Sequence, residues 1–120
     1  MRSIFAVLLA VVAVFVYGGC KKANASGPTI AEIKAFDTAT PELKQAWQAA
    51  LDADRTNDYV KGLGLCSSLL GENLPPEQRN AVARLSTSMK QRMSDAADRG
   101  DAAAQAAVQE LRQRSRNRQR

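Results

Sequence analysis

Few side chains in this 120-residue sequence have the chemistry that a catalytic site requires. The sequence contains no histidine, so the Cys66 thiol has no imidazole that could activate it as a nucleophile. Asp52, Asp54 and Asp58 lie near one turn, but their spacing is not that of a calcium-binding loop. We interpret the three aspartates as the solvated end of a helix, and we expect no enzymatic activity.

The sulfur-containing side chains are better explained by a protein core than by a metal site. Met89 and Met93 are four residues apart, which places both on one face of a helix, and thioethers commonly fill gaps in cores. Cys66 shares an apolar helical face with Leu63 and Leu70, so we predict a free, buried thiol. The sequence shows no zinc cluster, phosphate-binding loop or serine-hydrolase motif. We therefore expect no metal, no cofactor and no small-molecule substrate.

The C-terminal end of the sequence alternates arginine with polar residues. Five arginines fall within nine residues: Arg112, Arg114, Arg116, Arg118 and Arg120. Residues 21–111 carry 11 basic and 12 acidic side chains, so the net charge of +5 comes from these arginines and the N-terminal residues. We predict that residues 112–120 form a disordered tail, because the segment is too polar to pack.

Three roles are open for the arginine-rich tail. Outside a membrane it could bind anionic lipid head groups or an anionic polymer, because clustered cations release counterions from a polyanion. Nucleic acid is a candidate partner if the body of the protein faces the cytoplasm. In the third role, the tail only improves the solubility of the protein.

The N-terminal residues have the pattern of an export signal. Ile4–Tyr17 are 14 consecutive apolar positions that follow the positive charge of Arg2. A charged start, an apolar stretch of about 7–15 residues and small residues at its end describe a secretory signal peptide, which we place at residues 1–19. The alternative is an uncleaved membrane anchor, although a spanning helix needs about 20 apolar residues. Its orientation stays open, because basic residues flank both ends of the stretch.

The end of this segment resembles a known processing motif. Val16-Tyr17-Gly18-Gly19-Cys20 resembles the lipobox of bacterial lipoproteins. The resemblance implies cleavage before Cys20 and a diacylglycerol on its thiol. It also implies a body held at the cell membrane or outer membrane that faces the periplasm or the exterior. A disulfide between Cys20 and Cys66 is the alternative.

Composition limits what the rest of the chain can build. The last 100 residues contain 38 apolar side chains, of which 18 are alanine and three are the aromatics Phe36, Trp47 and Tyr59. Chains of this size bury a small core, so a large enzyme with a deep cleft is excluded. Residues 20–40, which are rich in small and polar side chains, are predicted to be a flexible tether that starts at the lipidated cysteine. The spacing of Ile30, Ile33 and Phe36, three residues apart, leaves open a short helical or extended turn within it.

Helix signals fill residues 41–111, which we take as the folded domain. Thr40-Pro41 predicts the start of a first helix, and a second covers residues 58–70. A third is expected from Pro76 to just before Gly100, and a fourth after Asp101. Strand signals are absent after residue 40. The expected fold is all-α, a small bundle of three to four helices after an N-terminal hydrophobic signal helix.

Three glycines in the predicted second helix and at its end carry structural predictions. Gly62 and Gly64 each cost about 1 kcal/mol relative to alanine inside a helix. We predict that a neighbouring helix approaches closely at both positions. Gly71 is predicted to end the helix in a left-handed conformation.

Two segments resemble the hairpins of helical repeat proteins. The Asn57-Asp58-Tyr59 turn looks like that of a tetratricopeptide hairpin, and Ala97–Gln105 looks like the A-x-x-G-D-x-x-A turn of Sel1-like repeats. The resemblance covers residues 41–113 and implies two stacked hairpins with a grooved surface that binds a partner peptide or protein. An ordinary helical bundle is the alternative.

These features together predict a small membrane-anchored envelope lipoprotein that carries a non-enzymatic helical interaction module. Its membrane partner is lipid attached through Cys20, and its second partner is a protein or peptide. The alternative is a membrane-anchored protein whose arginine-rich tail binds an anionic polymer or nucleic acid.

Overall fold

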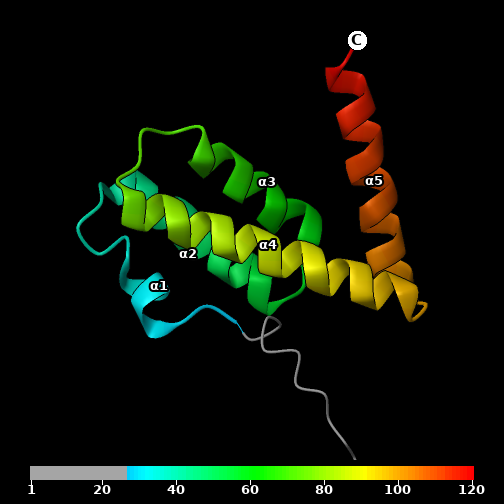
Figure 1. The fold of residues 1–120 in the computed structure, drawn as a ribbon, viewed down its shortest axis with the longest axis horizontal. Coiled ribbons are helices and arrows are strands. Elements are labelled where there is room, and N and C mark those ends of the chain that lie inside the picture. The colour runs from blue at the N-terminus through cyan, green and yellow to red at the C-terminus, as the bar shows by residue number, and fades with distance from the viewer. Residues whose placement is uncertain (1–26) are drawn as a thin grey trace, which may run out of the picture.

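The computed structural model describes residues 27–120, and these residues form an all-helical bundle (Figure 1). The elements in chain order are α1 (Ile30–Lys34), α2 (Pro41–Arg55), α3 (Tyr59–Leu70), α4 (Pro76–Asp98) and α5 (Ala102–Arg118). The predicted all-α fold is confirmed for this part of the chain. The predicted signal peptide, Cys20 and the first residues of the predicted tether lie outside the described residues.

Local capping signals set where the helices begin. The Leu43 N–H donates to the Thr40 hydroxyl at the start of α2 (3.4 Å), and Pro41 occupies the first turn. The Ala104 N–H donates to the Asp101 carboxylate at the start of α5 (3.1 Å). α4 begins at Pro76, as predicted. Gly71 instead has φ −75°, so the predicted left-handed end of α3 is wrong.

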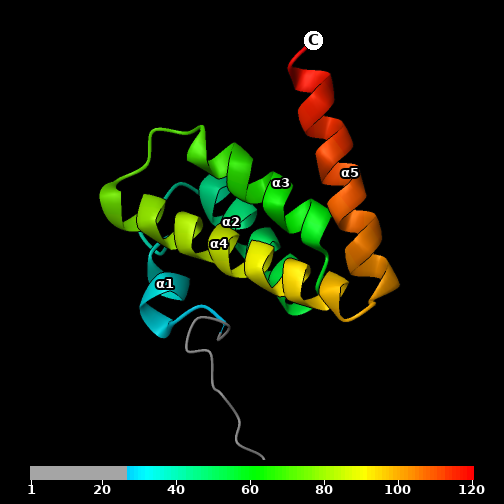
Figure 2. The same ribbon diagram turned by 45° about the vertical axis from the view of Figure 1, so that its right-hand side comes forward.

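Helix length determines how the bundle is arranged. α2 and α3 form a hairpin, and α4 packs along α3 (Figures 1 and 2). α4 has 23 residues whereas α3 has 12, which corresponds to about 35 Å against about 18 Å of helix. The chain turns at Gly100, where φ is +90°, a conformation that suits a residue without a Cβ. α5 therefore starts beyond the hairpin, and its C-terminal half stands apart from α3 in both views.

The core lies between the hairpin and α4. Its fully buried side chains include Cys66 of α3 together with Val82 and Met89 of α4. Met89 also contacts the position that a Cβ would occupy at Gly62. The predicted close approach at Gly62 is therefore confirmed. At Gly64 a Cβ would meet no atom within 4 Å, so the same prediction is wrong there.

Part of the predicted tether is folded. A capping box between Thr29 and Glu32 begins α1. Phe36 is 2% exposed and stacks on Trp47 of α2, with ring centroids 4.9 Å apart. The Trp47 indole N–H also donates to the Ile33 carbonyl (3.2 Å). The tether prediction is thus wrong for the residues from α1 to Phe36, because α1 contacts α4 and Phe36 packs on Trp47 of α2. The short turn that the spacing of Ile30, Ile33 and Phe36 left open is the helix α1.

The predicted disordered tail is also wrong for most of its length. α5 continues to Arg118, and only the last two residues lie beyond it. Cations near a helix C-terminus interact favourably with the helix dipole. Arg114 in addition pairs with Glu110 one turn earlier (2.5 Å). The arginine-rich segment is therefore helical through Arg118, with Arg116 and Arg118 in the last turn of α5.

Candidate functional site

The cysteine and the two methionines lie in the core. Cys66 is buried, as predicted, and forms no disulfide within residues 27–120. The alternative pairing with Cys20 lies outside the described residues. Burial raises the pKa of the Cys66 thiol to about 11, although the charge of Lys90 acts in the opposite direction. Met89 and Met93 are buried on the inner face of α4, which confirms core packing for both.

The three aspartates have separate structural roles. Asp52 pairs with Arg55 at the exposed end of α2 (2.5 Å), and Asp58 accepts a hydrogen bond from the Lys61 N–H at the start of α3 (3.3 Å). Asp54 is 4% exposed and forms an ion pair with Arg92 of α4. The prediction of a solvated helix end is therefore wrong for Asp54. Residues 27–120 contain no group of three or more acidic or cysteine side chains placed to hold a metal ion.

The ion pair between Asp54 and Arg92 joins two helices of the bundle. The Arg92 side chain is 24% exposed and comes from α4, so the pair ties the α2–α3 hairpin to α4. Desolvation by burial lowers the pKa of the Arg92 guanidinium. Arg92 also approaches the side-chain oxygen of Asn57 in the hairpin turn (3.5 Å).

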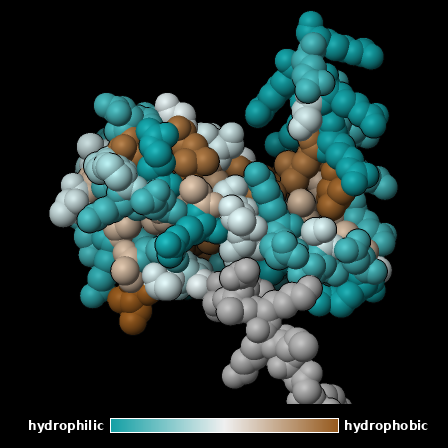
Figure 3. Space-filling model, in the orientation of Figure 1, coloured by the Kyte–Doolittle hydropathy of each residue, from teal (hydrophilic) through white to brown (hydrophobic). Residues whose placement is uncertain are grey.

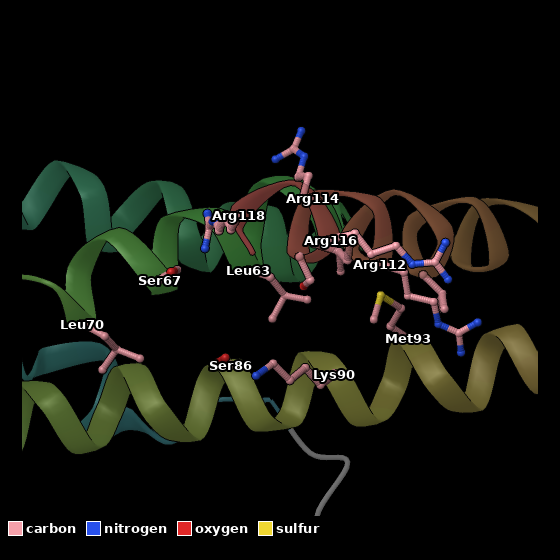
Figure 4. Close-up of a pocket in the computed structure, with 14 residues that line it drawn as sticks. Leu63, Ser67, Leu70, Ser86, Lys90, Met93, Arg112, Arg114, Arg116 and Arg118 are labelled. Carbon is pink, nitrogen blue, oxygen red and sulfur yellow. The ribbon is translucent and has the colours of Figure 1, made fainter. Parts of the chain in front are cut away.

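A groove of about 640 Å³ lies between α3, α4 and α5 (Figure 4). We call it the α5 groove. It is lined by Leu63, Gly64, Ser67, Leu70, Ser86, Lys90, Met93, Val108, Leu111, Arg112, Arg114, Ser115, Arg116 and Arg118. The groove exists because α5 starts at the overhanging end of α4 and returns at an angle to α3 (Figures 1 and 2).

The floor of the α5 groove is apolar. Leu63 and Met93 are buried at its base, and Leu70, Val108 and Leu111 are half-buried. Hydrophobic atoms gather on the side of α5 that faces the hollow (Figure 3). A concave, largely apolar surface with a few polar groups is the usual character of a binding site.

The rim of the α5 groove is cationic. At 100° per residue, Arg112 and Arg116 lie on one edge of the apolar stripe of α5, and Arg114 and Arg118 lie on the other. Lys90 adds a cation from α4 (Figure 4). Among the described residues that line the groove, none is acidic. The four arginines thus share one site, whereas Arg120, the fifth predicted residue, lies beyond α5 and outside the lining.

Sequence reasoning missed the α3 and α4 sides of the site. Ser67 and Ser86 were not singled out, because a serine beside an apolar stripe has no distinctive signal. The predicted fourth helix is α5, and the spacing of its apolar positions is the signal that could have shown its continuation to Arg118. The apolar positions Ala104, Val108 and Leu111 continue at helical spacing to Ser115 and Arg118.

Comparison of the chain with known protein families, curated proteins and solved structures finds no match. The likeness to tetratricopeptide and Sel1-like hairpins therefore stays a prediction. Between residues 27 and 120, no helix combines the length and apolar character needed to cross a bilayer.

Proposed function

We propose that the protein is a membrane-tethered interaction module and that the α5 groove is its docking surface. The observation that carries this proposal is the combination of an apolar floor and a cationic rim in one groove of about 640 Å³. Exposed apolar surface bordered by polar residues is typical of interaction sites. A helical partner segment that lies in an apolar groove is a common mode of recognition.

Membrane attachment is supported by the sequence of the first 20 residues. The lipobox-like Val16–Cys20 segment supports lipidation at Cys20 in a bacterial envelope. Acyl chains contribute about 0.8 kcal/mol per buried CH₂, so two chains anchor a small protein stably. Residues 21–27 would allow the body at most about 25 Å of separation from the anchor, at about 3.6 Å per residue.

Site-specific photo-crosslinking in cells of the native host tests the docking surface. A photoreactive amino acid replaces Ser67 of α3 or Ser115 of α5, both exposed in the α5 groove. The matched control carries it at Glu42, which is exposed on α2. We expect adducts of the same mass from Ser67 and Ser115 and none from Glu42. Absence of groove adducts, or equal adducts at all three positions, would overturn the proposal.

A second candidate function is favoured by the exposure of the arginines. All side chains from Arg112 to Arg120 are exposed to solvent, as an electrostatic contact with an anionic polymer or nucleic acid requires. Deletion of residues 112–120 should then abolish binding of polyglutamate or DNA. The affinity of the intact chain for DNA should fall as the salt concentration rises. For each phosphate contact, the logarithm of the binding constant should fall by about 0.7–0.9 for every tenfold rise in salt. Binding that survives the deletion would rule this function out.

A further inference from the structure

We infer that the α5 groove takes an amphipathic helix of a partner protein, with an apolar stripe bordered by aspartate or glutamate. This inference rests on the proposed function of the groove and names the chemistry of its occupant. It is carried by the charges of the rim, by the small residues on the α3 side and by the charge of the remaining chain.

Because arginines lie on both edges of the apolar stripe of α5, an occupant with negative charge on both of its own edges would be electrostatically complementary to the groove. Arg112 and Arg116 are spaced i,i+4, as are Arg114 and Arg118. Like charges at this spacing destabilise a helix by about 0.2–0.5 kcal/mol per pair. Within the described residues, Arg114 pairs with Glu110 (2.5 Å), whereas no ion pair forms at the other three arginines. Acidic side chains flanking an apolar stripe would relieve this repulsion on both edges.

Small residues on the groove surface allow a helix to approach closely. Gly64 is exposed in the groove, and a Cβ there would meet nothing within 4 Å. Its cost to α3, about 1 kcal/mol relative to alanine, is therefore not explained by packing in the chain itself. Ser67 lies nearly one turn further along the same groove-facing side. Helices pack with axes about 8–10 Å apart, and small side chains at the contact favour the short end of that range.

Charge argues against the chain's own N-terminal segment as the occupant. Residues 1–26 contain Arg2, Lys21 and Lys22 and no acidic residue. Their sign is thus the same as that of the groove rim. An acidic helix of another protein fits the charge of the rim and the apolar floor together.

The test is a binding titration with a designed peptide and the full-length protein in phosphatidylcholine nanodiscs. The fluorescent probe is a helical peptide of about four turns with a leucine stripe at i, i+3, i+4 and i+7 and glutamates on both edges. A scrambled peptide of the same composition keeps the charge and loses the stripe. Polyglutamate and phosphatidylglycerol vesicles serve as competitors that represent a polymer and a lipid surface.

We expect the striped peptide to bind at least about tenfold more tightly than the scrambled one, a difference of about 1.4 kcal/mol. Gly64→Leu, which places a side chain in the groove, should weaken binding about tenfold or more. Ser68→Leu on the same helix but outside the groove lining is its matched control. Removing two rim charges with Arg112→Gln and Arg116→Gln should weaken binding about tenfold, whereas Arg79→Gln with Arg99→Gln should not. Circular dichroism verifies that each variant is folded.

Each of the following results would overturn the inference. The scrambled peptide or polyglutamate could bind within about threefold of the striped peptide, which would make the groove a general polyanion surface. Phosphatidylglycerol vesicles could displace the striped peptide, which would make the occupant a lipid. Striped-peptide binding that Gly64→Leu leaves unchanged, or no binding at all, would remove the groove as a helix site. If groove adducts at Ser67 and Ser115 still form in cells, the proposed function stands and only this class of partner is wrong.

Discussion

Gly62 and Gly64 of α3 have different surroundings, so we expect substitutions at the two positions to change stability in opposite directions. A Cβ at Gly62 would collide with Met89, which is fully buried, and a Cβ at Gly64 would project into the open groove. We predict that Gly62→Ala lowers the free energy of unfolding by about 1–3 kcal/mol through overpacking. Gly64→Ala should raise it by up to about 1 kcal/mol through helix propensity. Urea unfolding measures both changes, and equal shifts of the same sign would contradict this account.

The buried ion pair predicts a strong asymmetry between single and double substitutions. Arg92→Met leaves Asp54 buried without its cation, so we expect a loss of about 3–5 kcal/mol. Combining it with Asp54→Ala removes both charges and should recover part of that loss. The exposed Asp52–Arg55 pair is the matched control, because Asp52→Ala should cost less than about 1 kcal/mol. If Arg92→Met lowers the free energy of unfolding in denaturant no more than Asp52→Ala does, this ion pair does not stabilise the packing of α2 against α4.

The buried thiol predicts how stability depends on pH. An unfolded cysteine loses its proton near pH 9.0, whereas folded Cys66 keeps its proton up to a pKa of about 11. Between these values the unfolded state binds fewer protons, so the stability contributed by the neutral buried thiol falls as pH rises. We expect wild-type protein to lose stability more steeply than Cys66→Ala between pH 9 and 11. Parallel guanidinium midpoints for the two proteins would show that the thiol is not protected.

At the scale of elements, α1 itself buries no residue, whereas Phe36, two residues after it, belongs to the core. Phe36→Ala removes a side chain that is 2% exposed and stacked on Trp47. We expect a loss of about 3–5 kcal/mol, the usual range for a buried phenylalanine. Trp47 is the single tryptophan of the chain, so its fluorescence should shift to the red. Ile30→Ala is the control, because Ile30 is 72% exposed and should change neither quantity appreciably.

The starts of the long helices could be predicted because their signals are local. Thr40, Pro76 and Asp101 act through the first turn of the helix that each begins. Phe36 could not be placed, because its burial depends on Trp47, which lies 11 residues further along the chain. Composition also misled the prediction for residues 112–118, since an arginine-rich segment at a helix C-terminus is favoured by the dipole.

The candidate site was predictable only in part. The arginines were recognised from sequence, but their grouping on two edges of one stripe requires α5 to be helical through Arg118. The apolar floor of the groove could not be predicted, because it depends on the length of α4 and on the turn at Gly100. Those features set the angle between α5 and α3, and no local sequence signal encodes that angle.

At the scale of the whole molecule, the described chain begins on one side of the bundle and α5 ends on another. α1 follows directly on the N-terminal residues and lies at one side of the bundle, whereas the C-terminal end of α5 projects at the other (Figures 1 and 2). The chain that would lead from the proposed anchor at Cys20 therefore joins the bundle on the side of α1 and not at the projecting end of α5.

Metabolic labelling with alkyne-palmitate tests the central claim, that this body works while held to a membrane through Cys20. Full-length wild-type protein and Cys20→Ser are expressed in a bacterial host, captured and assayed for incorporated fatty acid. We expect label on the wild-type protein and none on Cys20→Ser, with the same helical circular dichroism for both. Absence of label from the wild type, or label that persists in Cys20→Ser, would contradict the claim.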